Sequence, residues 1–224
     1  GLLGHSEGGV VASLCASKSN DVKFIILMAS TGDNGSVIIK EQSRRIYKFL
    51  GRPDSEIKKE IEKISKIHDA IITDSGWDEI RADFLKQTKE KFANSNNPQY
   101  SAVENKDIMI QNIVESQIQG LKTPWWKSIL TSNPADYMAK VKCPVLAIFG
   151  EKDFQVDAKN NSAKVSAALK KAGNKNVTIK TITGANHLFQ KAKTGAIEEY
   201  GKLDKAFIPG FLDIIAKWTI ETIK

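Results

Sequence analysis

The sequence predicts an α/β fold in which parallel strands with flanking helices are interrupted by an all-helical insertion. Short apolar runs at residues 24–28 and 145–149 are typical of strands buried on both faces, and VTIKTI at 177–182 predicts a further strand. Helical patterns separate these strands, an order that indicates parallel crossover units. From about residue 31 to residue 140 the sequence shows helical periodicity and no strand pattern.

A serine flanked by glycines lies near the start of the chain, in GLLGHSEGG. Gly-x-Ser-x-Gly is typical of a sharp strand-to-helix turn, in which the two elements approach too closely for a Cβ at Gly4 or Gly8. Such a turn lifts Ser6 Oγ clear of the sheet and puts it at the positive end of a helix. Because a helical pattern and a buried strand follow, the context favours a nucleophilic serine over an ordinary glycine-rich loop.

The chain contains three histidines that could serve as the base for this serine. His5 is adjacent to Ser6, and its side chain is expected to point away from Oγ into the sheet packing. His68 lies on a charged helix of the insertion and is expected at the surface. His187 follows the last strand in TGANHLFQ, where a side chain can reach over the carboxyl edge of a parallel sheet. By elimination and by placement, His187 is predicted to be the base.

An acid that orients this base is expected from another loop at the same edge. Asp153 follows the PVLAIFG strand by three residues and is the preferred candidate. Asp157 is the alternative, although it is better placed to cap the following helix. The chain order is then Ser6, Asp153, His187.

These motifs together, GHSEGG, GEKD after a buried strand and GANHLF, resemble the α/β-hydrolase superfamily. In particular they resemble bacterial serine esterases with a helical cap. The resemblance implies the C-terminal half of that fold, beginning at the nucleophile turn. Residues 1–30 would then be the turn, helix and strand of the core, residues 31–140 the helical cap, and residues 141–224 the rest of the core.

The resemblance also implies how the site would work. A full member of the superfamily has five strands before the serine turn, and the loop after the third donates one backbone N–H to the oxyanion hole. The second donor would be the backbone N–H of Glu7. Trp125 and Trp126 are candidates for an acyl pocket or, equally, for the core of the cap, and Phe154 and Leu188 are weaker pocket candidates. A chain without the five strands is expected to be weakly active or inactive.

The expected substrate is a small-molecule carboxylic ester, cleaved through an acyl-enzyme without a cofactor or metal. A serine peptidase, a thioesterase and a catalytically incompetent interaction domain are the alternatives, because a triad does not distinguish leaving groups. An open sheet edge on the side of the missing strands would favour a homodimer through that edge.

Composition bears on other classes of protein. The net charge of +7 comes from 33 basic and 26 acidic residues, but these alternate at helical spacing, as in EIKKEIEKISK, which indicates solvated helix faces and no nucleic-acid partner. No apolar run reaches the roughly 18 residues of a membrane span. Cys15 and Cys143 lie in apolar segments and are expected to be buried core residues rather than a disulfide or a metal site.

Overall fold

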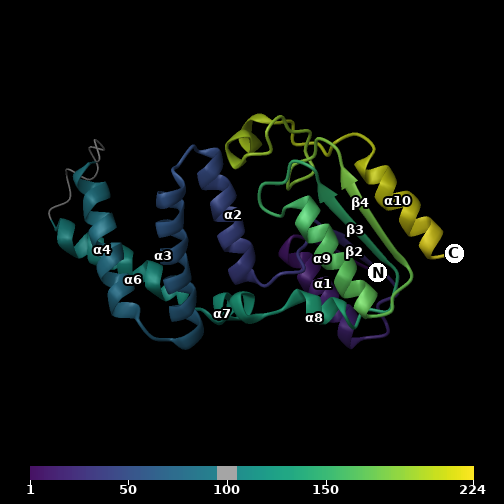
Figure 1. The fold of residues 1–224 in the computed structure, drawn as a ribbon, viewed down its shortest axis with the longest axis horizontal. Coiled ribbons are helices and arrows are strands. Elements are labelled where there is room, and N and C mark those ends of the chain that lie inside the picture. The colour runs from purple at the N-terminus through teal and green to yellow at the C-terminus, as the bar shows by residue number, and fades with distance from the viewer. Residues whose placement is uncertain (95–104) are drawn as a thin grey trace. The chain divides into compact units, whose positions relative to one another are not determined.

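A computed structural model of the chain describes residues 1–94 and 105–224 (Figure 1). The chain divides into two compact units, one formed by Gly1–Asp54 with Ser132–Lys224 and the other by Ser55–Thr131. The boundaries expected for the cap, residues 31 and 140, stay a prediction.

The first unit contains, in its described residues, a four-stranded parallel sheet with helices on both faces. Its strands lie in the order β1 (Leu2–His5), β2 (Ile25–Met28), β3 (Val145–Gly150) and β4 (Val177–Ile182). Its helices are α1 (Glu7–Lys18), α2 (Gly35–Phe49), α8 (Pro134–Met138), α9 (Ala158–Lys171), the 3₁₀ helix η1 (Ile197–Lys202) and α10 (Phe211–Thr222). This architecture is the α/β fold that the sequence predicted.

The two central strands are apolar throughout because each face of the sheet carries its own core. Ile25 and Leu27 pack in a cluster with residues of α1, α8 and α9. Ile26 and Met28 point to the other face and pack with Phe211 of α10. In Figure 1, α10 accordingly lies across the sheet from α9. Every residue of β2 and β3 is buried, which explains the uninterrupted apolar runs.

The helix after the serine turn packs on the sheet through its small residues. Gly9, Ala12 and Ser13 are buried, whereas Val11 is 51% exposed and Cys15 is exposed. The expectation of a buried Cys15 is therefore wrong. A helix that leaves a tight turn must approach the sheet closely, so its small residues face the sheet and its larger apolar residues face outward. Cys143 is partly buried.

The second unit is helical in its described residues. Its elements are α3 (Asp54–Thr73, which begins at the boundary residue), α4 (Trp77–Ala93), α6 (Lys106–Leu121) and α7 (Pro124–Thr131). Ile57, Ile61 and Ile71 of α3 are buried, as the isoleucine spacing indicates. Among residues 1–94 and 105–224, no helix combines the length and the apolar character that crossing a membrane requires.

His68 lies in the buried stripe of α3 and is only 4% exposed. The expectation of a surface position is wrong. His68 follows Ile61 by seven residues and Ile64 by four, and this spacing places it on the same helical face as those residues. The helical periodicity predicts burial here, although the charged residues around His68 suggested exposure.

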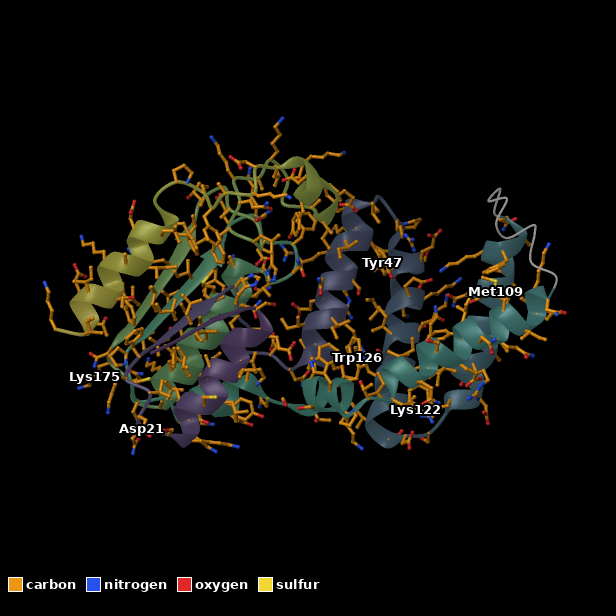
Figure 2. All side chains as sticks on the ribbon, turned by 180° about the vertical axis from the view of Figure 1, so that it is seen from behind. Asp21, Tyr47, Met109, Lys122, Trp126 and Lys175 are labelled. Carbon is orange, nitrogen blue, oxygen red and sulfur yellow. The ribbon has the colours of Figure 1, made fainter. Side chains whose placement is uncertain are left out.

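The amino and carboxyl edges of the sheet carry different kinds of loop. Asp21 and Lys175, labelled in Figure 2, lie in the connections that lead into β2 and β4, at the amino edge. Ser6, Asp153 and His187 all follow the ends of strands, at the opposite edge. Because the strands are parallel, their carboxyl ends bring residues distant in sequence to one side of the sheet.

Candidate active site

Ser6 occupies a strained turn between β1 and α1. Its backbone has φ 54° and ψ −118°, a conformation that costs a non-glycine residue about 1–3 kcal/mol. Two backbone hydrogen bonds hold the turn: Ser6 N–H donates to the Met28 carbonyl at 2.7 Å, and Gly9 N–H donates to the Ser6 carbonyl at 3.0 Å. Strain of this kind at a serine between a strand and a helix is what a nucleophile turn requires.

The glycines around Ser6 differ in how much space a Cβ would have at each position. A Cβ on Gly4 would lie 2.1 Å from the Gly8 carbonyl oxygen, and a Cβ on Gly9 would lie 2.5 Å from the Ser30 side chain. Position 8 has no atom within 4 Å of such a Cβ. Close packing therefore requires glycine at positions 4 and 9, and the expectation that Gly8 is required for the same reason is wrong.

Asp153 is fully buried in the loop that follows β3. Its Oδ1 accepts backbone hydrogen bonds from Gln155 at 2.7 Å and Val156 at 2.8 Å. Its Oδ2 lies 2.8 Å from His187 Nδ1. The backbone contacts fix the carboxyl group, so that one oxygen is left for the imidazole.

His187 is 4% exposed, and its imidazole has a defined hydrogen-bonding direction. A carboxylate accepts hydrogen bonds, so we assign the proton of the neutral ring to Nδ1, which donates it to Asp153. Nε2 then carries the lone pair. This is the tautomer that a general base needs.

The loop that carries His187 is held by its own side chains. Asn186 Oδ1 accepts from the backbone N–H groups of Leu188 at 3.0 Å and Gln190 at 2.9 Å, and Asn186 Nδ2 donates to Gln190 Oε1 at 3.0 Å. Phe189 adopts a left-handed backbone conformation with φ 58°, and its buried ring stacks on Phe211 at 4.3 Å between centroids. The turn is thereby anchored to the core under α10.

The structure thus brings Asp153 and His187 into direct contact and places Ser6 at the same edge of the sheet. The ring of His5, the residue before Ser6, lies 4.6 Å from the ring of His187 between centroids. No hydrogen bond joins Ser6 Oγ to His187 in the part of the chain that the structure describes. Nucleophile–base hydrogen bonds are often long in the absence of substrate and tighten in the reacting complex.

Asp157, the alternative acid, is the N-cap residue of α9. Its Oδ1 accepts from the backbone N–H of Asn160 at 2.8 Å, and its other oxygen lies 3.5 Å from an Arg45 nitrogen. Its contacts serve the helix and not the imidazole. Glu7 is the first residue of α1, so its backbone N–H lies at the helix N-terminus directly after Ser6.

Polar contacts hold the loop after β3, which carries Asp153, on two sides. Gln155 Oε1 accepts from Gln42 of α2 at 3.1 Å, and Gln155 Nε2 donates to the Tyr200 hydroxyl at 3.3 Å. Arg45 of α2 donates to the Phe154 carbonyl at 3.3 Å. Burial raises the pKa of Tyr200, so the hydroxyl stays neutral and available for hydrogen bonding. Sequence reasoning missed Gln155 and Tyr200, and no motif marks either of them.

The four pocket candidates have different surroundings. The Phe154 ring lies edge-on to Phe49 at 5.1 Å, and Leu188 is 40% exposed. In the second unit the Trp125 and Trp126 rings are edge-to-face at 4.8 Å, and Trp126, labelled in Figure 2, lines a cavity of about 440 Å³. The remaining lining residues of that cavity are Phe84, Gln87, Thr88, Lys91, Gln117, Gly120 and Leu121.

No group of three or more His, Cys, Asp or Glu side chains in the described residues could hold a metal ion. The polar groups gathered at the carboxyl edge, a serine, a histidine and a carboxylate, are those of nucleophilic acyl chemistry.

A parallel sheet with helices on both faces, a strained serine turn after a strand, and an Asp–His pair in the later strand-end loops define a protein of the α/β-hydrolase superfamily. The profile of the prolyl oligopeptidase family matches residues 86–208, more than half of the chain and a range that includes Asp153 and His187. The chain belongs to this family.

Solved structures that resemble this chain include two esterases and a bromoperoxidase. An esterase from Pyrococcus furiosus is 13% identical, with a TM-score of 0.47 over 99% of this chain and 53% of that one. A thermophilic esterase from Thermogutta terrifontis is 17% identical, with a TM-score of 0.44 over 99% and 64%. A putative non-heme bromoperoxidase from Mycobacterium tuberculosis is 14% identical, with a TM-score of 0.44 over 98% and 66%.

The chain therefore spans between about half and two thirds of the length of these solved structures. No curated protein matches the chain by sequence.

Proposed function

We propose that the protein is a serine hydrolase that cleaves carboxylic esters through an acyl-enzyme. The observation that carries this proposal is the buried Asp153–His187 pair, joined at 2.8 Å, whose free imidazole nitrogen is on the same sheet edge as the strained Ser6. A buried carboxylate that orients a histidine prepares the imidazole to act as a base, and a serine at a nucleophile turn is a group that such a pair activates.

In the proposed reaction Ser6 Oγ attacks the ester carbonyl while His187 Nε2 takes the hydroxyl proton. Asp153 stabilises the imidazolium that forms, and the backbone N–H of Glu7 donates to the developing oxyanion. The C–O bond to the alcohol then breaks, and His187 returns the proton to the leaving alcohol. Water repeats the sequence on the acyl-enzyme, which releases the acid and restores Ser6.

Phe154 and Leu188 flank the acid and the base, and we propose them as walls of the substrate site. The ring of Phe154 is fixed by Phe49 and by the Arg45 guanidinium, 5.4 Å from its centroid. Trp125 and Trp126 stay candidates for the acyl pocket or for the core of the helical unit.

A peptidase is the second candidate, favoured by the family profile that matches residues 86–208. The triad chemistry is the same, but the leaving group is an amine instead of an alcohol. The test measures the turnover of two substrates, a proline-containing peptide anilide and an aryl ester. Each is given separately to the protein as its gene encodes it, and the comparison distinguishes a peptidase from an esterase. Faster turnover of the anilide would favour the peptidase.

The test of the serine mechanism combines labelling with turnover. A fluorophosphonate probe should modify Ser6, located by mass spectrometry, and Ser6→Ala should abolish both labelling and aryl-ester hydrolysis. Ser17→Ala, on the same helix region but with its hydroxyl bonded to the Leu14 carbonyl at 2.7 Å, is the matched control and should retain both. Undiminished turnover in Ser6→Ala would contradict the proposal.

A further inference from the structure

His5 makes a long-range hydrogen bond that the proposed reaction does not use. Its Nε2 lies 2.8 Å from the carbonyl oxygen of His187, although the two residues are 182 positions apart in the chain. A carbonyl oxygen can only accept, so Nε2 carries the proton and donates it. The hydrogen bond therefore determines the tautomer of His5.

The ring of His5 is also held by its neighbours. It lies 4.6 Å from the His187 ring at an interplanar angle of 51° and 6.4 Å from the Phe189 ring at 69°, an edge-on arrangement. Phe189 belongs to the same loop as His187 and is fully buried. The imidazole of His5 thus contacts both the backbone and the side chains of the loop that carries the base.

We propose that His5 is a positioning residue that fixes the backbone of His187 in register with the turn that carries Ser6. His5 precedes Ser6 directly, so one side-chain hydrogen bond connects the chain segment of the nucleophile to the chain segment of the base. This inference rests on the proposed serine mechanism and assigns a role to a histidine that sequence reasoning assigned to sheet packing. Its ring does pack, beside Phe189, but its Nε2 is directed to His187.

The charge state of His5 suits this role. Burial is the largest influence and lowers the pKa of His5 below its ordinary value of 6.5, and the charge of His187 acts in the same direction. The hydrogen bond to His187 and the charge of Asp153 oppose the change. A neutral donor is required here, because a cation beside His187 would oppose the imidazolium that forms during catalysis.

The experiment compares two replacements of different chemistry. In His5→Phe the ring is retained and the donor is lost, whereas the amide nitrogen of His5→Gln can donate to the same carbonyl. For an aryl ester, His5→Phe should lower kcat by roughly tenfold to a hundredfold with little change in KM, since misplacement of a catalytic group costs rate rather than binding. His5→Gln should recover most of that loss. Wild-type kcat in His5→Phe, or equal impairment in both variants, would overturn the proposal.

Ser6→Ala, measured in parallel, separates this proposal from the proposed function. Turnover that survives in Ser6→Ala means that the serine mechanism is wrong. Loss of turnover in Ser6→Ala together with full turnover in His5→Phe means that only the role of His5 is wrong.

A measurement on the wild-type protein covers the case in which a variant does not fold. Nitrogen-15 NMR of the histidine rings at pH 7 should show His5 neutral and protonated at Nε2. A ring protonated at Nδ1 alone would overturn the proposal. Because folding lowers the pKa of His5, the unfolded chain binds this proton more readily than the folded protein does. The contribution of His5 to the free energy of unfolding should therefore be fully present above pH 6.5 and should be lost as the pH falls through the lowered pKa.

Discussion

Replacement of Asp153 by asparagine removes one negative charge from the candidate site while keeping the shape of the side chain. The amide oxygen of the new side chain can still accept from the backbone N–H groups of Gln155 and Val156, which now lie 2.7 and 2.8 Å from Oδ1. The amide nitrogen then faces His187 Nδ1, where the carboxylate oxygen lies at 2.8 Å in the native protein. Two donors would meet, unless His187 changes its tautomer.

The tautomer change has a calculable consequence for activity. With Nδ1 as the acceptor, the proton moves to Nε2, and Nε2 no longer has a lone pair for the Ser6 proton. We expect kcat to fall by about 10⁴, the loss typical of a triad with the wrong tautomer. The free energy of unfolding should fall by only about 1–3 kcal/mol, because both backbone hydrogen bonds are retained and the third, to His187, changes from a charge-assisted bond to a neutral one.

The assay is hydrolysis of a chromogenic aryl ester, with unfolding followed by circular dichroism. Asp157→Asn is the matched control, because asparagine caps a helix about as well as aspartate, and it should keep nearly full activity and stability. If Asp153→Asn retained activity within tenfold of wild type, or Asp157→Asn lost as much, the assignment of the acid would be wrong.

Three other features of the structure give definite expectations. Gly4→Ala should destabilise the protein by roughly 1–3 kcal/mol, since the new Cβ would lie 2.1 Å from a backbone oxygen. Gly8→Ala should leave the stability unchanged, because no atom of the described residues lies within 4 Å of a Cβ at that position. Equal denaturation midpoints for the two variants would contradict this packing. The exposed Cys15 should react with a thiol reagent before Cys143, whose thiol pKa is raised by burial, and Cys15→Ser should remove the fast phase. In the described residues β1 pairs with β2 alone, and we propose that the other side of β1 pairs with a second copy of the chain in a homodimer. Light scattering should then give twice 24.7 kDa, and a clean monomer would contradict the proposal.

The sequence by itself determined the secondary structure around the site. The apolar run VLAIFG predicted β3, and VTIKTI predicted β4, because the burial of a strand is visible in the local pattern of apolar residues. The order of strands and helices also predicted that Asp153 and His187 follow strands that end at one edge. The structure brings these two side chains together as expected.

Which face of α1 lies against the sheet was decided only by tertiary packing, whereas the burial of His68 in α3 follows from the helical spacing. The apolar residues of α1 suggested a buried Cys15, but the close approach of the helix to the sheet buries Gly9 and Ala12 instead. In α3 the charged neighbours of His68 suggested exposure, and the helical spacing from Ile61 gave the correct answer. Amphipathic periodicity describes a helix alone, whereas burial also depends on how near its neighbour comes.

The contacts around His187 and the loop of Asp153 are long-range, and the sequence holds no local pattern for them. His5 reaches the carbonyl of a residue 182 positions away, and Gln155 links Gln42 to Tyr200 across three separate segments. In the sequence, nothing distinguishes these polar residues from others of the same type. They become partners only because the fold brings their segments together. The sequence could therefore predict which groups carry the proposed chemistry. The tertiary structure alone decided which groups hold them in place, because hydrogen bonds form between neighbours in space whatever their separation along the chain.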